Sequence, residues 1–335
     1  MISKLVERFN KLNLHDTNIA VVGDIILDRY LYGKVTRISP EAPVPIVSIC
    51  DSKNVLGGAS NVAANLAGIK SNVFITGVIG NDDNGNKLLD LLKNFEIDNR
   101  AVILSDLRKT ITKITICKTI FDPQRGQMLR MDFEDVNGLN NNDTVSLYKN
   151  INNLVKSGLD GIIISDYAKG VCSEEFCKWI IKLAHDNGIC VLIDPKGYNW
   201  DKYRGCDFIT PNLKELCDVS GYKCHNIDND IVTMAKNVKN KYDIKNVVVT
   251  RSEKGITLVN DTEVLHSSAL AREVFDVSGA GDTVAAVFLY SVLNGFTYKE
   301  AMDLANFAAG IVVRKVGTYP IKRDDLQEYL NSRIM

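Results

Sequence analysis

The residues of this chain best suited to chemistry lie in one short run near its C-terminus, Asp276-Val277-Ser278-Gly279-Ala280-Gly281-Asp282-Thr283. Two glycines in three residues let the backbone turn sharply and bring its N–H groups close to a ligand. A helix that begins there would offer unpaired N–H groups and the positive end of its dipole to an anion. Asp282, the only carboxylate inside the turn, could take a proton from a hydroxyl while the amides hold developing negative charge. The run therefore predicts phosphoryl transfer, with an ordinary helix start capped by Asp282 as the alternative.

The elements around this run predict a sheet that could position it. A strand-like run ends near Phe275, and an apolar segment over 284–293 follows the turn. Buried strands are also expected over 19–24 and 73–79, and the second half of the chain alternates strands with amphipathic helices. Its strands are expected over 161–165, 190–194, 208–210, 247–250 and 256–259, and two of its helices over 174–187 and 230–242. Such alternation predicts an α/β fold, a mostly parallel sheet with helices on both faces.

Two other segments have a different pattern. Residues 30–51 alternate and contain Pro40, Pro43 and Pro45, which exclude a central strand of the main sheet. Residues 108–134 predict a β-hairpin, with strands over 110–116 and 128–133 and a turn at Asp122-Pro123. Together they predict a small β-sheet lid, from about 30–50 and 108–134, on a single domain that spans 1–335.

Composition sets the class of protein. The chain has 335 residues, of which 45% are hydrophobic and 24% charged, and a net charge of −1, as is ordinary for a globular protein without nucleic acid or membrane partners. The first 16 residues predict an amphipathic helix and not a signal peptide. Eight scattered cysteines without a C-x-x-C pair predict reduced, mostly structural thiols in the cytoplasm.

Polar groups follow most of the expected strands. Asp24 follows the first, and the runs 166–170, 194–197, 210–215 and 250–255 follow later ones. Each run alone is more often a simple turn, but the carboxyl ends of parallel strands form one edge, where active sites lie. A P-loop motif and a complete G-x-G-x-x-G are absent, and the four histidines form no pair, which disfavours P-loop, dinucleotide and histidine-based enzymes.

Two of these motifs carry a family resemblance. Gly57-Gly58 with Asn61, and the run 276–283, resemble the two signature motifs of the ribokinase-like (PfkB) carbohydrate kinases, over nearly the whole chain. The runs 23–30, 38–45, 166–170, 194–197 and 250–253 are most similar to the D-glycero-β-D-manno-heptose 7-phosphate kinases of that family. The resemblance implies a three-layer α/β/α fold. It also implies ATP-dependent phosphorylation of the anomeric hydroxyl of heptose 7-phosphate, giving the 1,7-bisphosphate, in ADP-heptose and lipopolysaccharide core biosynthesis. Because the chain has no H-x-G-H motif, the stand-alone kinase form without a nucleotidyltransferase domain is expected.

The resemblance also assigns residues. Asp282 would be the base, the N–H groups of Gly279, Ala280 and Gly281 the anion hole, and Asn212 with Glu215 would organise Mg²⁺, mainly through water. Sugar hydroxyls would be held by Asp24, Gly57, Gly58 and Asn61, and the nucleotide by Thr250, Ser252 and Gly255. The substrate's own phosphate needs cations, for which Lys169, Lys196, Arg37 and Arg130 are candidates. Lys169 and Lys196 are favoured because they follow strand ends, with solvated surface lysines as the alternative.

Some consequences of the resemblance stay open. The lid would exclude water and form a homodimer contact. A monovalent cation near Asp276 and Gly317, as in some relatives, is left undecided. The alternatives are another kinase of the family, of the ribokinase, fructokinase or 1-phosphofructokinase type, or a catalytically silent protein that binds sugar or nucleotide. The 38–45 run and the two lysine turns argue against the first alternative, and the intact Asp282 turn against the second.

Overall fold

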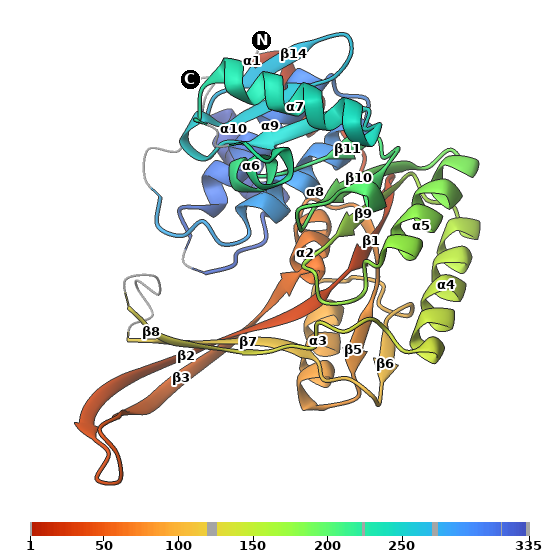
Figure 1. Ribbon diagram of the computed structural model, residues 1–335. Helices are drawn as coiled ribbons and strands as arrows, with labels where there is room; N and C mark the ends of the chain where they lie inside the picture. Colours follow the sequence, from red (N-terminus) through yellow and green to blue (C-terminus); the bar gives the residue numbers. More distant parts are fainter. Residues whose placement is uncertain (1, 119–125, 223–224, 270–273, 316, 333–335) are drawn as a thin grey trace.

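An eight-stranded sheet flanked by helices forms the centre of the computed structural model, which describes residues 2–118, 126–222, 225–269, 274–315 and 317–332 (Figure 1). Its strand order is β14-β13-β12-β11-β10-β9-β1-β4, and only the pairs that involve β13 and β14 are antiparallel. The strands are β1 (Asn18–Gly23), β4 (Asn72–Thr76), β9 (Gly161–Ser165), β10 (Cys190–Asp194), β11 (Phe208–Ile209), β12 (Asn246–Thr250), β13 (Ile256–Val259) and β14 (Val264–Ser267).

The sheet is buried on both faces, because alternate side chains of its apolar strands enter two separate cores. Ile19 and Val21 of β1 point into one core, and Ala20 and Val22 point into the other. The first core takes side chains from α1 (Ile2–Asn10), α2 (Ala59–Gly68), α3 (Asp83–Asn94), α8 (Ala280–Leu293), α9 (Tyr298–Val312) and α10 (Arg323–Asn331). The second takes them from α4 (Asn141–Lys156), α5 (Glu174–Asp186), α6 (Leu213–Ser220) and α7 (Asp228–Tyr242). The predicted three-layer arrangement is confirmed.

Polar side chains fix where several of these helices begin. Asn212 accepts a hydrogen bond from the N–H of Glu215, whose carboxylate accepts one from the N–H of Asn212, a capping box at the start of α6. Thr297 and Glu300 form the same motif at α9. The C-terminal end of α8 is fixed by a glycine instead: Gly295 adopts a left-handed φ of 78° that ends the helix. Short 3₁₀ turns, η1 (Asp201–Tyr203) and η2 (Ser252–Lys254), complete the helical segments.

A second sheet, the small sheet, extends away from the first as a long arm (Figure 1). Its strands, in spatial order, are β3 (Pro45–Gly58), β2 (Ile25–Ile38), β7 (Ile111–Cys117) and β8 (Gln127–Phe133). The predicted hairpin of β7 and β8 is confirmed, while its turn at Asp122-Pro123 lies outside the described residues. Pro40 and Pro43 lie in the connection between β2 and β3, and Pro45 begins β3 at the edge of the small sheet, as the exclusion of proline from central strands requires.

The structure also corrects three details. The expected strand over 73–79 divides at Gly77 into β4 and β5 (Val78–Gly80), which pairs with β6 (Ile103–Ser105) in a sheet of its own. A side chain at Gly77 would place its Cβ 2.4 Å from the Gly23 carbonyl oxygen, so only glycine allows this close crossing. Residues 274 and 275 are not in a strand, and β14 ends at Ser267.

The third correction concerns the thiols. Six cysteines of the described chain are not in disulfide bonds: Cys50, Cys117, Cys172, Cys177, Cys190 and Cys206. Cys217 is disulfide-bonded, so the prediction of reduced thiols is wrong for this residue. None of the helices in the described part of the chain is both long enough and apolar enough to span a bilayer.

Candidate active site

The carboxyl ends of the central strands form the floor of the candidate site. Gly23, Ser165 and Asp194 end β1, β9 and β10 in the same register, so the loops that follow them leave the sheet side by side. The N-terminus of α8 faces this edge, and three cavities surround it. We call them the polar cavity, the acidic cavity and the large cleft. Asp282 lines the first two, and the acidic cavity shares Asn212, Thr250 and Gly281 with the large cleft.

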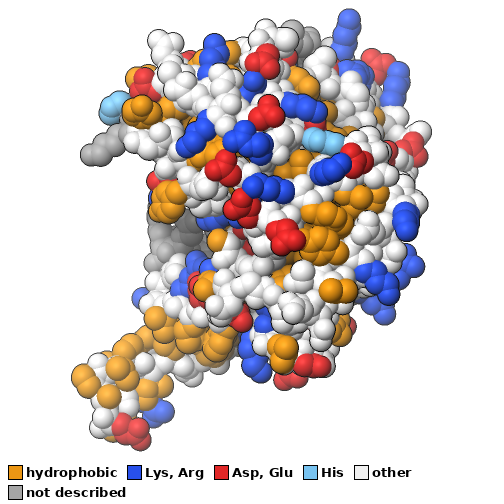
Figure 2. Space-filling view, turned by 45° about the vertical axis from the view of Figure 1, so that its right-hand side comes forward, with side chains coloured by type: hydrophobic (Ala, Val, Ile, Leu, Met, Phe, Trp, Pro, Cys, Tyr) orange, Lys and Arg blue, Asp and Glu red, His pale blue; other side chains and the backbone are white. Residues whose placement is uncertain are grey.

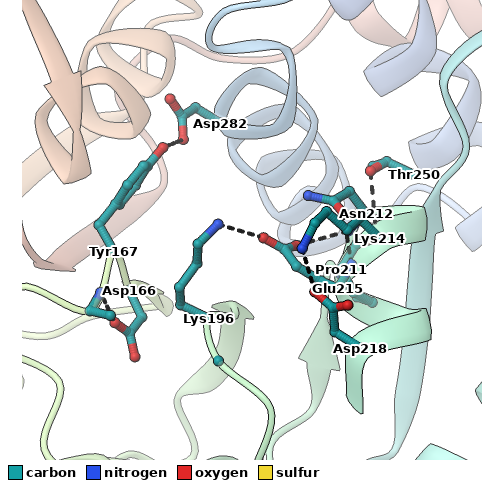
Figure 3. A network of polar contacts seen from close by, with 12 residues as sticks. Asp166, Tyr167, Lys196, Pro211, Asn212, Lys214, Glu215, Asp218, Thr250 and Asp282 are labelled. Carbon is teal, nitrogen blue, oxygen red and sulfur yellow. Dashed lines mark hydrogen bonds and ion pairs between the residues drawn. The ribbon is translucent and has the colours of Figure 1, made fainter. Parts of the chain in front are cut away.

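Asp282 is held at this junction by two hydrogen-bond donors. Asn61 Nδ2 donates to Oδ2 at 2.6 Å. The Tyr167 hydroxyl donates to Oδ1 at 2.9 Å (Figure 3). The residue is only 5% exposed. Burial raises the pKa of Asp282 to about 6, although the two hydrogen bonds act in the opposite direction. A carboxylate with a pKa just below neutral is ionised at pH 7 and still basic enough to accept a proton in a reaction.

The turn before Asp282 offers backbone donors. Gly279 has a left-handed φ of 78°, and a Cβ there would lie 2.6 Å from Asn61 Nδ2, so glycine is required. Among the described residues, no acceptor faces the N–H groups of Gly279, Gly281 and Asp282, whereas Ala280 donates to the Val277 carbonyl at 3.2 Å. Two of the three predicted anion-hole groups are therefore available to a ligand, beside the positive end of the α8 dipole.

The polar cavity, of about 260 Å³, lies between the turn and the small sheet. It contains the predicted residues Gly57, Gly58 and Arg130, together with Asp28, Tyr30, Lys113, Thr115, Gln127, Tyr167 and Thr318. Burial raises the pKa of Asp28 to about 6, against the effect of Lys113 and Arg130. Sequence reasoning left Asp28 as a residue that could be solvated. The one feature of the sequence that could have indicated a role in the site was the position of Asp28 on β2, four residues after Asp24.

Asp24 lies elsewhere. Its side chain is completely buried, and its carboxylate accepts hydrogen bonds from the backbone N–H groups of Tyr167, Lys169 and Val171 at 2.9, 3.0 and 3.2 Å. It lines none of the three cavities. Asp24 therefore holds the loop that carries Tyr167, at the point where the chain leaves β1 for β2. The structure does not bring this predicted sugar-binding residue into contact with the cavity.

The acidic cavity, of about 150 Å³, is lined by four carboxylates, which lie after β9, at the end of β10, in α6 and in α8: Asp166, Asp194, Glu215 and Asp282. Burial, with the charges of Asp282 and Glu215 next, raises the pKa of Asp194 well above its ordinary value. The Asp194 carboxylate accepts no hydrogen bond from the described residues, so a cation there would relieve both its isolation and this repulsion.

These oxygen donors fit Mg²⁺, which prefers carboxylates, phosphates and water. Asn212 and Glu215 are engaged in their capping box, and Lys196 Nζ lies 2.9 Å from Glu215 Oε1 (Figure 3). Within the described chain, no three His, Cys, Asp or Glu side chains converge closely enough to bind a metal directly. An ion would therefore be held through water and substrate oxygens, near Asp194 as well as near the predicted Asn212 and Glu215.

The large cleft, of about 1310 Å³, opens on the other side of the glycine turn. Its walls include apolar side chains such as Ile256, Val277, Val284 and Val313, which suit a flat heteroaromatic ring. The predicted residues Thr250, Ser252 and Gly255 line it, as do Ala280 and Gly281. Gly255 has a φ of 81°, and a Cβ there would meet the Ser267 carbonyl oxygen at 2.0 Å, so this turn also depends on glycine.

The predicted cations separate into two groups. Lys169 is paired with Glu134 at 2.7 Å and lines none of the cavities, and Arg37 lies exposed on the arm. Lys196 lines the acidic cavity, whereas Arg130 lines the polar cavity. Lys113, which sequence reasoning missed, also lines the polar cavity. The sequence feature that could have identified Lys113 is the alternation of side chains along β7, which places Lys113 and Thr115 on the same face of the strand.

The model of the pfkB family carbohydrate kinases matches residues 16–324. Bifunctional protein HldE of Methylobacillus flagellatus is 42% identical over 315 residues, which cover 94% of this chain and 63% of the relative. Bifunctional protein HldE of Haemophilus ducreyi is 40% identical over 323 residues, 96% of this chain and 65% of the relative. The chain thus spans somewhat less than two thirds of the length of these relatives.

Solved structures with low sequence identity share the fold. Phosphofructokinase-2 from Escherichia coli, in complex with substrates and products, has a TM-score of 0.77 at 17% identity and covers 95% of this chain and 100% of its own. Ribokinase from Arabidopsis thaliana, complexed with ribose and ATP, has a TM-score of 0.74 at 19% identity and covers 94% and 98%. The predicted ribokinase-like fold is confirmed.

Proposed function

This chain belongs to the pfkB family of carbohydrate kinases, and we propose that it transfers the γ-phosphoryl group of ATP to the anomeric hydroxyl of D-glycero-D-manno-heptose 7-phosphate. The product is the 1,7-bisphosphate, an intermediate for ADP-heptose and the lipopolysaccharide core. The choice of substrate is supported by the similarity to the HldE proteins and by the runs 23–30 and 38–45.

The observation that carries the proposal is the position of Asp282. It lines both the polar cavity and the acidic cavity, next to backbone N–H groups that have no acceptor in the described chain. A sugar in the polar cavity presents its hydroxyl to the Asp282 carboxylate, which accepts the proton as the oxygen attacks phosphorus. The N–H groups of Gly279 and Gly281 hold the charge that develops on the transferred group.

The other residues orient the reactants. Asp28 and the backbone at Gly57 and Gly58, which line the polar cavity together with Asp282, bind sugar hydroxyls, and Asn61 keeps the base in place. The nucleotide lies in the large cleft, along Thr250, Ser252 and Gly255. Lys196 and Glu215 flank the path of its phosphates. Mg²⁺, when bound near Asp194, Asn212 and Glu215, neutralises charge on the phosphates.

We also propose a homodimer that forms through the small sheet, in the cytoplasm, where ATP is available. Large apolar side chains are exposed on the arm: Val35, Ile38, Val44, Ile49, Leu129, Met131 and Phe133. Figure 2 shows hydrophobic side chains covering much of the protruding arm at the lower left. Apolar surface of this kind on a protruding sheet is typical of a contact between subunits.

The test is turnover of ATP by the purified protein with a panel of acceptors: heptose 7-phosphate, fructose 6-phosphate, fructose 1-phosphate, ribose and fructose. We expect strong preference for heptose 7-phosphate and a product with phosphates at both C1 and C7, identified by phosphorus NMR. Preference for another sugar would replace the substrate and keep the family. Tight binding of ATP and sugar without turnover of any acceptor would favour the silent binding protein.

A further inference from the structure

The small sheet presents two cations to the polar cavity, Lys113 from β7 and Arg130 from β8. We propose that they form a subsite for a phosphate monoester, which the sugar carries at the end remote from the hydroxyl that reacts. This inference rests on the proposed function, because it places the sugar between Asp282 and the small sheet. It identifies residues that would select a phosphorylated sugar over a free one.

The pairing of the strands brings the two side chains together. Asp28, Lys113 and Asp132 lie opposite one another across β2, β7 and β8, and the next row on the same face contains Tyr30, Thr115 and Arg130. Lys113 and Arg130 are therefore diagonal neighbours, a separation of about 7–8 Å that long side chains can bridge. We call this face, which lines the cavity, the inner face. Thr115 and Gln127 add neutral donors beside the two charges.

Both cations have donors available to a ligand. The Lys113 ammonium lies 5.2 Å from the centre of the Tyr167 ring and forms neither a hydrogen bond nor an ion pair with the described residues. Arg130 uses Nε and one N–H of Nη2 in two hydrogen bonds of 2.8 Å to Asp132, which leaves the two donors of Nη1 and the second donor of Nη2 without an acceptor among the described residues. Asp132 thus fixes the plane of the guanidinium group, and Lys113 supplies a charge that no adjacent carboxylate binds directly. A phosphate dianion can accept charge-assisted hydrogen bonds from both.

The order of groups along the cavity matches a sugar with a phosphate at its far end. Asp282 lies at the central sheet, and β2 and β7 run away from it in parallel, so Asp28 and Lys113 come first and Tyr30 and Thr115 come after them. Arg130 is opposite Thr115. The hydroxyl that reacts would lie at Asp282, the ring beside Asp28, and the phosphate between Lys113 and Arg130.

The lysines favoured from the sequence are less suitable for this role. Lys169 Nζ is 2.7 Å from Glu134 Oε2 and lies outside the polar cavity, and Lys196 is paired with Glu215 on the nucleotide side of Asp282. A phosphate on the sugar would have to cross the base to reach Lys196. The subsite therefore lies on the small sheet and not on the loops of the central sheet.

The experiment uses two variants of the protein, Lys113→Gln and Arg130→Gln. In each variant it compares a phosphorylated sugar acceptor with the same sugar without its phosphate. The readout is the ratio of kcat/KM for heptose 7-phosphate to kcat/KM for the free heptose. Lys113 also lowers the pKa of Asp282, but an effect on the base changes both acceptors alike and cancels in the ratio. We expect each variant to lower the ratio roughly tenfold to a hundredfold, as loss of a hydrogen bond to a charged group implies.

Three further variants, Lys34→Gln, Arg130→Lys and Lys169→Gln, sharpen the result. Lys34→Gln removes an exposed lysine from β2 outside the polar cavity and should leave the ratio unchanged. Arg130→Lys keeps the charge, loses the planar fork, and should recover part of the ratio. Thermal melting verifies that each variant is folded. Equal losses on both acceptors in Lys113→Gln and Arg130→Gln, or a lowered ratio in Lys169→Gln alone, would overturn the subsite.

A second measurement keeps the inference testable if heptose 7-phosphate is not a substrate. Calorimetric titration would compare ribose 5-phosphate with ribose, fructose 6-phosphate with fructose, and heptose 7-phosphate with heptose. Tighter binding of at least one phosphorylated sugar, lost in Lys113→Gln and in Arg130→Gln, would support the subsite even though the proposed substrate had failed. No preference for any phosphorylated sugar over its parent would exclude the subsite, whatever the enzyme phosphorylates.

Discussion

The two sheets of this protein differ in how their faces are used. The central sheet is buried on both faces, and its strands end in loops that meet at Asp282. The small sheet has an inner face of polar and charged side chains along the polar cavity and an outer face on which Leu129 and Phe133 are 53% and 54% exposed. The central sheet therefore forms the hydrophobic core and presents candidate site residues at one edge. The small sheet separates the polar cavity on its inner face from the exposed surface on its outer face.

This difference suggests that the central sheet positions the groups for catalysis, whereas the small sheet recognises the sugar. The proposed base, the backbone donors of the glycine turn and the acidic cavity belong to the closely packed part of the molecule, where small displacements would be costly for catalysis. The residues that we assign to sugar and phosphate recognition lie on β2, β7 and β8, whose inner face lines the polar cavity. Substitutions on the two sheets should therefore affect different quantities.

The largest effect is expected at the reactive edge. Asp282→Asn keeps the shape of the side chain and removes the proposed base, so kcat should fall about 10²- to 10⁴-fold, the usual contribution of general base catalysis. Binding of ATP, measured by calorimetry, should change little, because Asp282 does not line the large cleft. Activity within a few fold of the original protein would remove Asp282 from the base role.

The same substitution should not destabilise the fold. The pKa of Asp282 rises from 3.8 in an exposed setting to about 6 in the fold, so the folded state keeps the proton to higher pH than the unfolded chain. Stability is therefore lost as pH rises from about 4 to 6, and above that range ionisation of Asp282 costs up to about 3 kcal/mol. Urea unfolding at pH 7.5 should show Asp282→Asn at least as stable as the original protein. A marked loss would mean that the carboxylate is structurally required.

Asp24 and Asp28 provide the next contrast. They are four residues apart, but Asp24 holds the loop that carries Tyr167, whereas Asp28 lines the polar cavity. Asp24→Ala leaves the N–H groups of Tyr167, Lys169 and Val171, which are buried or partly buried, without this acceptor and should lower the free energy of unfolding by about 2–4 kcal/mol. Asp28→Asn removes a charged acceptor for the sugar and should lower kcat/KM roughly tenfold to a hundredfold with an unchanged melting temperature. If Asp24→Ala is as stable as the original protein, or if Asp28→Asn mainly unfolds it, the assignment of the two residues is reversed.

The sequence predicted the central sheet well for a physical reason. Strands such as 161–165 and 190–194 are buried on both faces, so they appear as continuous apolar runs with polar residues at one end. The glycine turn before Asp282 was equally visible, because a positive φ and a close contact with Asn61 require glycine at position 279, whereas a Cβ at Gly281 would meet no atom within 4 Å. Local pattern was sufficient wherever burial or backbone conformation left little choice.

The sequence was less informative where the roles of neighbouring residues depend on pairing across the small sheet. Whether Asp24 or Asp28 faces the cavity depends on where the chain leaves β1 for β2, which no local pattern marks. Lys113 could be recognised only once β7 was paired with β2 and β8. Lys169 follows a strand as predicted, but Glu134, 35 residues earlier in the sequence, neutralises it. These are long-range contacts, which single residue types do not encode.

The outer face of the small sheet should determine oligomeric state. Phe133→Glu places a charge among apolar side chains of β8 and should weaken a dimer through this face at least about tenfold, since burying an unpaired charge is costly. Sedimentation at micromolar concentration would measure the effect. Val136→Glu, at a similarly exposed apolar residue beyond the end of β8, is the matched control and should leave the dimer intact. A monomeric original protein, or an unchanged dimer in Phe133→Glu, would place the subunit contact elsewhere or exclude it.

The smallest effect is expected where the two regions meet, at Tyr167. Its hydroxyl donates to Asp282, and its ring lies beneath the ammonium group of Lys113 from the small sheet. Tyr167→Phe keeps the ring and removes a hydrogen bond that lowers the pKa of Asp282, so that pKa should rise further above its present value of about 6. Because the base must be ionised, the acid limb of kcat/KM moves to higher pH, and the rate should fall roughly three- to tenfold at pH 6 with a smaller loss at pH 8. Tyr148→Phe, which removes a hydroxyl on α4 outside all three cavities, should leave the profile unchanged. A loss of the same size at both pH values would mean that the hydroxyl acts through packing or substrate contact and does not tune the base.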